Sequence, residues 1–203
     1  MSPAELALVV LAGGRAERMG GIVKGHLLRR DGRTILAAIL GDLGPLAGSI
    51  ALVATAAKHA EIALPEGLLR LSDEGQGPAA AVMVAAEALA APWLLVVGAD
   101  QARASTAAVR WLLEALGEGD SALVAEVDGQ REPLLALYRR DALLQLGGSQ
   151  RGGSLMRLLD GIGARALAPP PELCAAFGSV NTWAEAEGER GAPTPGPTPG
   201  QDA

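Results

Sequence analysis

A glycine-rich segment that leads into cationic side chains, residues 11–24, holds the residues of this chain best suited to chemistry. It follows the apolar run Leu6–Leu11, which has the length and composition of a buried strand. Glycines allow positive φ and a close backbone approach to a ligand, so successive N–H groups can face anionic oxygens. Arg15, Arg18 and Lys24 add positive charge. The segment therefore predicts a cradle for the phosphates of a nucleotide.

The spacing of this segment is neither the dinucleotide-binding fingerprint nor the Walker loop. It resembles the signature of the molybdenum cofactor guanylyltransferases, part of the larger MobA-like nucleotidyltransferase family, which reads roughly L-A-G-G-x-x-x-R-M-G-x-x-x-K. The matching positions are Leu11, Ala12, Gly13, Gly14, Arg18, Met19, Gly20 and Lys24. The resemblance extends from about Leu6 to Glu187. An ordinary glycine-rich turn beside a solvated basic face is the alternative interpretation.

The resemblance implies roles for residues of this segment. The nucleotide-binding positions would be Leu11, Ala12, Gly13, Gly14 and Lys24. An ammonium group near the α- and β-phosphates stabilises charge that forms in the transition state, which gives Lys24 a catalytic part. Arg18 and Arg15 would hold the departing pyrophosphate, although the family varies at the position of Arg15. A solvent-exposed cation is the alternative for Lys24.

Asp100 is the expected metal ligand. It follows the run Trp93–Val97, whose continuous hydrophobicity is typical of a central strand covered on both faces. Ligands of open α/β sheets bind beyond the carboxyl ends of the strands. By resemblance, Asp100 is the aspartate of a D-x-P motif that binds Mg²⁺, an ion that prefers one or two carboxylates together with phosphate oxygens and waters. An aspartate that caps a helix or a turn is the alternative.

Two more polar residues belong to the implied site. Asp73 resembles the aspartate that precedes the family's G-P-L-A-G stretch, which the chain keeps only in part, at Gly77, Pro78 and Ala80. Its carboxylate could accept hydrogen bonds from the N1–H and the exocyclic amine of guanine, a donor pair that adenine lacks. Asn181 matches the second asparagine of a late N-x-N-T stretch and would position the metal or its waters. A turn aspartate and a turn or helix-capping asparagine are the alternatives.

Several positions depart from the family pattern or fit it loosely. The departures are Val23 for an aspartate before the lysine, Ala57 for an asparagine that touches the nucleotide, Ala102 for the proline of D-x-P, and Ser179 for the first asparagine of N-x-N-T. Glu132 and Pro133 resemble a position near the acceptor, where Arg131 and Arg151 could meet a phosphate, or could simply be exposed charge. Removal of a single group that stabilises the transition state can cost on the order of a hundredfold in rate.

Composition narrows the classes of protein. The net charge is -6 with no basic block, which argues against a nucleic-acid partner. One cysteine, Cys174, allows no disulfide within the chain, so a reducing, cytoplasmic location is expected. The two histidines, His26 and His59, lack zinc-ligand spacing. No apolar run reaches the roughly 18 residues of a membrane span, and the N-terminal residues do not resemble a signal peptide.

Short apolar runs alternate with helical patterns, which predicts a three-layer α/β/α, Rossmann-like nucleotidyltransferase fold with a mostly parallel sheet. The expected strands are Ala7–Leu11, Ile50–Thr55, Leu68–Leu71, Trp93–Val97, Ser121–Val127 and Leu134–Tyr138, with a short one at Ala164–Leu167. The expected helices are Thr34–Leu43, Pro78–Leu89, Ser105–Leu116, Arg140–Gly147 and Ser154–Leu159. Residues 1–188 would form one domain, and residues 189–203 a disordered Pro/Gly-rich tail.

The function that the resemblance implies is transfer of GMP from GTP-Mg²⁺ to the terminal phosphate of molybdopterin or its molybdenum form, with release of pyrophosphate. GTP, that cofactor, and a molybdoenzyme or cofactor-handling protein would be the partners. Two alternatives stay open at this point. The same fold could use another base, such as cytosine, or another phosphorylated acceptor. The four departures could also leave a nucleotide-binding or regulatory protein with little turnover.

Overall fold

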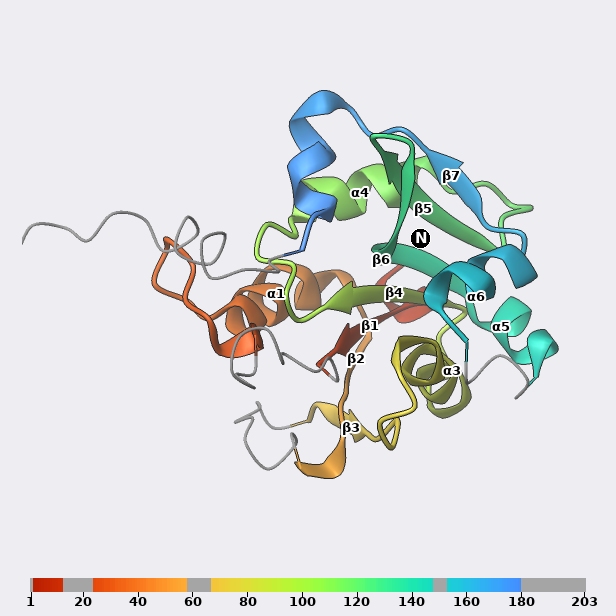
Figure 1. Cartoon of the computed structure of the whole chain (residues 1–203), viewed down its shortest axis with the longest axis horizontal. Helices are drawn as coiled ribbons and strands as arrows, with labels where there is room; N and C mark the ends of the chain where they lie inside the picture. The colour runs from red at the N-terminus through yellow and green to blue at the C-terminus, as the bar shows by residue number, and fades with distance from the viewer. Residues whose placement is uncertain (1, 13–23, 58–66, 148–152, 180–203) are drawn as a thin grey trace, which may run out of the picture.

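The computed structural model describes residues 2–12, 24–57, 67–147 and 153–179. These residues form three layers, with a seven-stranded sheet between two groups of helices (Figure 1). The strands are β1 (Leu6–Leu11), β2 (Ser49–Val53), β3 (Leu69–Leu71), β4 (Trp93–Gly98), β5 (Ala122–Val127), β6 (Gln130–Arg139) and β7 (Arg165–Leu167). Their order across the sheet is β3-β2-β1-β4-β6-β5-β7. The predicted three-layer α/β architecture is confirmed.

The sheet of the described residues is parallel except for β6, which runs antiparallel to both β4 and β5. β5 and β6 are joined by Asp128 and Gly129, whose φ angles are 52° and 74°, values typical of a two-residue type I′ hairpin turn. Because the turn has only two residues, β6 begins directly after it, at Gln130. The prediction that this strand starts at Leu134 is therefore wrong at that end.

Five α-helices lie within the described ranges, each with ends within two residues of its predicted position. They are α1 (Ile35–Leu43), α3 (Pro78–Ala88), α4 (Thr106–Ala115), α5 (Arg140–Leu146) and α6 (Leu155–Gly161). Short 3₁₀ helices occur at η1 (Pro3–Glu5), η3 (Lys24–His26), η4 (Gly44–Leu46) and η6 (Pro171–Phe177). Three of the helices start at a hydroxyl that accepts from a backbone N–H, as N-caps do: Thr34, Ser105 and Ser154. No helix in these ranges is long and apolar enough to cross a membrane.

The two faces of the sheet are covered by different helices. Leu6, Leu8 and Val10 of β1 pack with α1, α4 and η6, whereas Ala7 and Val9 pack with α3, α5 and α6. Figure 1 shows α1 and α4 on one side of β1 and β4, with α3 on the other. Successive residues of a strand point to opposite faces, so both faces of β1 are buried, as its uninterrupted apolar run predicted.

Small side chains fill much of the second face. The buried alanines there come from both the sheet and α3: Ala7, Ala51, Ala81, Ala85, Ala86, Ala122 and Ala136. Opposed alanines allow α3 to lie close to the sheet, which keeps the interior dense without large side chains. This is how a chain with 2% aromatic residues forms a full core. The predicted boundary between residues 188 and 189 lies outside the described residues.

Candidate functional site

Four neighbouring parallel strands, β3, β2, β1 and β4, end at the same edge of the sheet. Hydrogen bonds carry the ladder one residue past the strand ends: Ala99 N–H donates to the Leu11 carbonyl at 2.9 Å, Ala12 N–H to Val53 at 2.8 Å, and Ala54 N–H to Leu71 at 3.0 Å. The backbone at this edge is therefore held in register across four strands. We refer to it as the carboxyl edge.

Asp73 and Asp100 lie at the two ends of this carboxyl edge. Asp73 follows β3 and Asp100 follows β4, so β2 and β1 lie between them. At the usual spacing of neighbouring strands, three steps across the sheet separate the two positions by about 14 Å. Ala12, the last described residue before the predicted phosphate-binding segment, follows β1 between them. The strand ends that lead to the predicted base-binding, phosphate-binding and metal-binding residues therefore share one edge.

The loop that carries Asp73 is tightly built. Glu74 and Gly75 have φ angles of 51° and 75°, and the N–H of Gln76 donates to the Asp73 carbonyl at 3.0 Å, which together make a mirror-image β-turn. The Asp73 side chain is 5% exposed, and its Oδ1 accepts from the N–H of Gly75 at 3.1 Å. Asp73 therefore lies in a turn that its own carboxylate helps to hold. Its Oδ2 receives no hydrogen bond from a described residue.

The loop of Asp73 also meets the end of β2. A Cβ built on Gly75 would lie 3.8 Å from Cγ2 of Thr55. Ala56 and Ala57, which follow Thr55, are exposed in a short helical turn. Ala57 therefore follows β2, the strand that neighbours β3, and lies beyond the carboxyl edge of the sheet. The position where the family signature has an asparagine carries no polar side chain here.

Asp100 is in a compact turn that follows β4. The N–H of Gln101 donates to the Gly98 carbonyl, and the N–H of Ala102 donates to the Asp100 carbonyl, both at 3.1 Å. A Cβ on Gly98 would lie 2.6 Å from Oδ1 of Asp100 and 2.9 Å from Leu134. A side chain at position 98 would therefore displace the side chains of Asp100 and Leu134, because the Asp100 carboxylate folds back over the strand end. Ala102 is 2% exposed and donates a hydrogen bond that the family's proline could not.

Lys24 begins η3, which packs against the end of β4. A Cβ on Gly25 would lie 3.3 Å from Cβ of Leu36 and 3.5 Å from Cβ of Ala99, so the lack of a side chain at Gly25 allows the close contact. The backbone of Lys24 is consequently next to the strand end that leads to Asp100.

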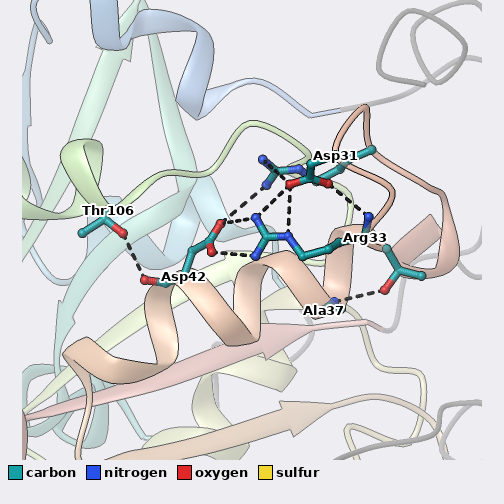
Figure 2. A network of polar contacts seen from close by, with 7 residues as sticks. Asp31, Arg33, Ala37, Asp42 and Thr106 are labelled. Carbon is teal, nitrogen blue, oxygen red and sulfur yellow. Dashed lines mark hydrogen bonds and ion pairs between the residues drawn. The ribbon is translucent and has the colours of Figure 1, made fainter. Parts of the chain in front are cut away.

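A network of ion pairs holds the chain segment between η3 and α1 (Figure 2). The Arg33 guanidinium contacts Asp31 at 2.8 Å and Asp42 at 2.7 Å, and Arg29 adds longer contacts to both carboxylates. The hydrogen bonds from Arg33 are the main reason that the pKa values of Asp31 and Asp42 lie below their ordinary values. Water and salt screen exposed pairs of this kind, which therefore add little to stability, so the network orients the segment more than it stabilises the fold.

β6 brings Glu132 and Pro133 to the carboxyl edge, because its antiparallel direction places its first residues there. The pairing between β5 and β6 shifts between Leu123–Leu137 and Ala125–Glu132, which leaves three extra residues on β6. Leu135, in this bulge, has φ of 53° although it is fully buried. Bulges and strained residues of this kind are common beside functional sites. Burial raises the pKa of Glu132 above its ordinary value.

Other predicted residues fall elsewhere or outside the described ranges. Gly13, Gly14, Arg15, Arg18, Val23, Arg151 and Asn181 lie outside the residues that the structure describes. Arg131 forms an ion pair with Asp160 at 2.6 Å. Cys174 is a half-buried free thiol, in agreement with a small apolar role. Ser179 lies two residues beyond η6.

The residues present can accommodate one hard divalent cation. The described part of the chain has no group of three or more His, Cys, Asp or Glu side chains that could form an all-protein metal cage. A single carboxylate beside a phosphate-binding segment is instead the donor set that Mg²⁺ uses when the substrate supplies the other oxygens. Asp100 is the residue that the sequence predicts for that carboxylate.

Comparisons with known proteins agree with this geometry. The family model described as the MobA-like NTP transferase domain matches residues 8–166. A molybdenum cofactor guanylyltransferase of Serratia proteamaculans is 32% identical over 183 residues, which is 88% of this chain and 90% of that protein. The corresponding protein of Shewanella loihica is 32% identical over 148 residues, 70% of this chain and 72% of that protein.

A solved structure has the same fold. Molybdopterin-guanine dinucleotide biosynthesis protein A from Archaeoglobus fulgidus superposes with a TM-score of 0.70 at 21% identity, covering 91% of this chain and 96% of that one. At this identity the likeness concerns the fold. The seven-stranded sheet with its carboxyl edge is therefore shared with a protein of that name.

Proposed function

Because the chain belongs to the family of MobA-like NTP transferase domains, we propose that it transfers GMP from GTP to the terminal phosphate of molybdopterin or its molybdenum form. The chain is a nucleotidyltransferase of the α/β type. The observation that carries the proposal is the shared carboxyl edge, where Asp73 and Asp100 flank the start of the phosphate-binding segment. A nucleotide laid along this edge would have its base at β3 and its phosphates at β1 and β4.

Asp73 would select the base. Its carboxylate is almost buried and is oriented by the N–H of Gly75, so little conformational freedom is lost when a ligand binds. Guanine offers two adjacent donors to such a carboxylate. Adenine offers no equivalent pair, and a site built to accept two hydrogen bonds discriminates strongly against a ligand that lacks them.

Asp100 and Lys24 would act on the phosphates. In the transfer, an oxygen of the acceptor phosphate forms a bond to the α-phosphorus of GTP, and the bond to the β-phosphate oxygen breaks, which releases pyrophosphate. Asp100 would hold a divalent cation, proposed to be Mg²⁺, which when bound offsets charge on the triphosphate. Lys24 would contact the same phosphates, with Gly13, Gly14 and Arg18 beside it and Asn181 near the metal. No covalent enzyme intermediate is required, because the acceptor phosphate is the nucleophile.

The acceptor would approach from the side of β6. The base position at β3 and the phosphates at β1 and β4 occupy one half of the edge, and Glu132 and Pro133 lie beyond β4 in the strand order. The bulge in β6 shapes this side and leaves Glu132 half-buried there. Another phosphorylated acceptor would use the same side of the site. The identity of the acceptor is therefore tested by comparing acceptors in the activity assay.

Pyrophosphate release tests the reaction. Purified protein with GTP, Mg²⁺ and molybdopterin should release pyrophosphate, and Asp100→Asn should reduce the rate at least a hundredfold. The matched control is Asp141→Asn, the same change at a carboxylate of α5 that is 78% exposed, and it should retain full activity. Failure of the wild-type protein to release pyrophosphate, with Asp100→Asn unchanged in metal-dependent GTP binding, would contradict the proposal.

A thermal-shift comparison of GTP, CTP, ATP and UTP tests the base. A ligand at 100 times its Kd stabilises the native state by about 2.7 kcal/mol, and GTP should give the largest shift. Asp73→Asn should remove that preference, whereas Glu74→Gln, at the exposed next residue, should keep it. A larger shift with CTP would instead identify a cytidylyltransferase.

The location and partners follow from the same proposal. A cytoplasmic enzyme fits the free thiol of Cys174, since reducing compartments keep thiols unpaired. A molybdoenzyme or cofactor-handling protein would receive the product. Co-purification of such a partner with this protein, compared with and without bound product, is the direct measurement of this interaction.

A further inference from the structure

Gln101, next to Asp100, is a buried polar residue whose side chain bridges two parts of the chain. It is 1% exposed, and among the described residues only Asp73 is a comparably buried polar or charged side chain. Buried polar groups are retained where both ends of the group find partners. The amide of Gln101 has a partner at each end, and the two partners belong to different parts of the chain.

The oxygen of this amide replaces a missing strand contact. Ala99 N–H donates to Leu11 of β1, so the N–H of the preceding residue, Gly98, points the opposite way, toward β6. The pairing of β4 with β6 ends at Val96 and Ala136, because β6 bulges beyond that pair. Oε1 of Gln101 accepts the otherwise unpaired Gly98 N–H at 3.0 Å.

The nitrogen of the amide holds the end of η6. Nε2 of Gln101 donates to the Phe177 carbonyl at 3.2 Å. Phe177 is 1% exposed, and its ring meets Trp111 of α4 edge-on, with centroids 5.8 Å apart and planes at 72°. Gln101 therefore links the turn after β4 to a rigid part of the core 76 residues later in the chain.

Asp100 lies between these fixed points. The amide holds Gly98, two residues before Asp100, and belongs to Gln101, the residue after it, and Oδ1 of Asp100 lies against Gly98. The family's D-x-P motif has a proline that would restrict this turn, but the chain has Ala102. Any restriction of this turn that the proline ring would provide must therefore come from other contacts of the turn.

We propose that Gln101 is a positioning residue for the metal carboxylate: its amide fixes the turn of Asp100 between the end of β4 and the end of η6. This inference rests on the proposed function, since it takes Asp100 to be the metal ligand. Supporting residues around metal ligands commonly change metal affinity by 10- to 100-fold when they are replaced. Gln101 acts through the backbone of Asp100 and does not itself contact the substrate.

The test compares GTP binding with and without metal. Calorimetry in Mg²⁺ and in EDTA gives a metal enhancement of GTP affinity for each protein. Gln101→Met keeps the length of the side chain and removes both hydrogen bonds. It should reduce the enhancement on the order of tenfold and leave the affinity in EDTA unchanged. Gln145→Met, at an exposed position of α5, is the matched control and should behave as wild type.

A double variant separates positioning from general destabilisation. If Gln101 acts through Asp100, Gln101→Met should cost nothing further in the Asp100→Asn background, because effects through one group are not additive. In turnover, kcat should fall and the Mg²⁺ concentration for half-activation should rise, with KM for GTP at saturating Mg²⁺ unchanged. Equal losses in EDTA and in Mg²⁺, or additive losses in the double variant, would overturn the proposal.

Gln101→Glu provides a second variant if Gln101→Met does not fold. It keeps an acceptor for Gly98 N–H and loses the donor to Phe177, so it should lower the metal enhancement in the same way. Normal enhancement in Gln101→Glu would likewise overturn the proposal. The failure of the proposed function has a different signature, in which wild type shows no metal enhancement and Asp100→Asn binds GTP as wild type does.

Discussion

The hydroxyl of Tyr138 donates a 2.6 Å hydrogen bond to the carbonyl of Pro133, across the bulge in β6. Tyr138 is fully buried, and burial raises the pKa of its hydroxyl, so the group remains a donor at all ordinary pH values. Pro133 has no N–H to give to a ladder, and proline within a sheet is confined to edges and bulges. The hydrogen bond therefore closes the bulge that carries Glu132 to the carboxyl edge.

Tyr138→Phe should lower the free energy of unfolding by about 1 kcal/mol. The ring stays buried, but the Pro133 carbonyl loses its donor. Urea unfolding at pH 7 measures the change. An unchanged midpoint would mean that water or another donor replaces the hydroxyl and that the bulge does not depend on Tyr138.

Asp120→Ala should lower stability by about 2 kcal/mol, the usual size for hydrogen bonds to charged groups. Arg165 of β7 meets Asp120 with two nitrogens, at 2.8 and 2.6 Å, and the Gly117 N–H adds a third contact at 2.8 Å. Asp160→Ala, which breaks the pair of Arg131 with a carboxylate that is 63% exposed, is the control and should cost under about 1 kcal/mol. Equal costs in the two variants would contradict a larger contribution from the Asp120–Arg165 pair, whose Asp120 side chain is only 11% exposed.

The contribution of Asp120 should also disappear in acid. The hydrogen bond from Arg165 is the first reason that its pKa lies below the ordinary value. A lowered pKa means that the native state binds this proton less readily than the unfolded state. The stability is therefore complete above the unfolded pKa of about 3.9 and is lost as the pH falls through the native value. Urea curves of wild type and Asp120→Ala should approach one another below about pH 4.

Glu132→Gln should have the opposite pH signature. Burial raises the pKa of Glu132, so the native state favours the protonated form and the charged form is destabilising. Stability should fall as the pH rises through the interval between the unfolded pKa, about 4.3, and the native value. Thermal melts should then show Glu132→Gln above wild type at pH 7 and equal to it in acid. A variant that is less stable at pH 7 would contradict this assignment.

Gly25→Val should destabilise the protein by about 1–3 kcal/mol, the usual cost of overpacking. The two added methyl groups would push η3 away from Leu36 and Ala99, where a Cβ alone is already 3.3 and 3.5 Å away. Because Lys24 precedes Gly25, GTP affinity should fall as well. Gly119→Val, at an exposed glycine with nothing within 4 Å of its Cβ position, is the control for both measurements. Normal GTP binding by Gly25→Val would mean that the contribution of Lys24 to GTP binding does not depend on the packing of η3.

The sequence predicted the features that depend on local pattern. The apolar run at Trp93–Val97 and the capped helices at Ser105 and Ser154 appear in the structure nearly where they were expected, because burial and N-capping act over a few residues. The Asp128–Gly129 turn has a recognisable hairpin signal, and reading it would have placed the start of β6 correctly. The placement of Asp100 at the same edge as the end of the Leu6–Leu11 run followed from the rule for strand ends, whereas Asp73 was expected there only by resemblance.

Other features depend on contacts between distant segments. Gln101 meets Phe177 across 76 residues, and Arg165 meets Asp120 across 45, so neither pair has a local sequence signal. The positive φ of Leu135 opposes the preference of a leucine and is imposed by the bulge. Such features arise where the fold constrains the chain. Gln101 and Leu135 lie near the candidate site, whereas the Asp120–Arg165 pair lies at the opposite edge of the sheet.

Ala57→Asn should increase GTP affinity. Ala57 is exposed two residues after Thr55, which lies against the loop of Asp73, and the family signature has at this position an asparagine that touches the nucleotide. One hydrogen bond contributes about 1 kcal/mol, which corresponds to roughly a fivefold tighter Kd. Calorimetry with GTP measures it, and Ala56→Asn, the same change at the exposed preceding residue, is the matched control. If Ala56→Asn tightens binding equally, or Ala57→Asn has no effect, the nucleotide does not lie along the end of β2.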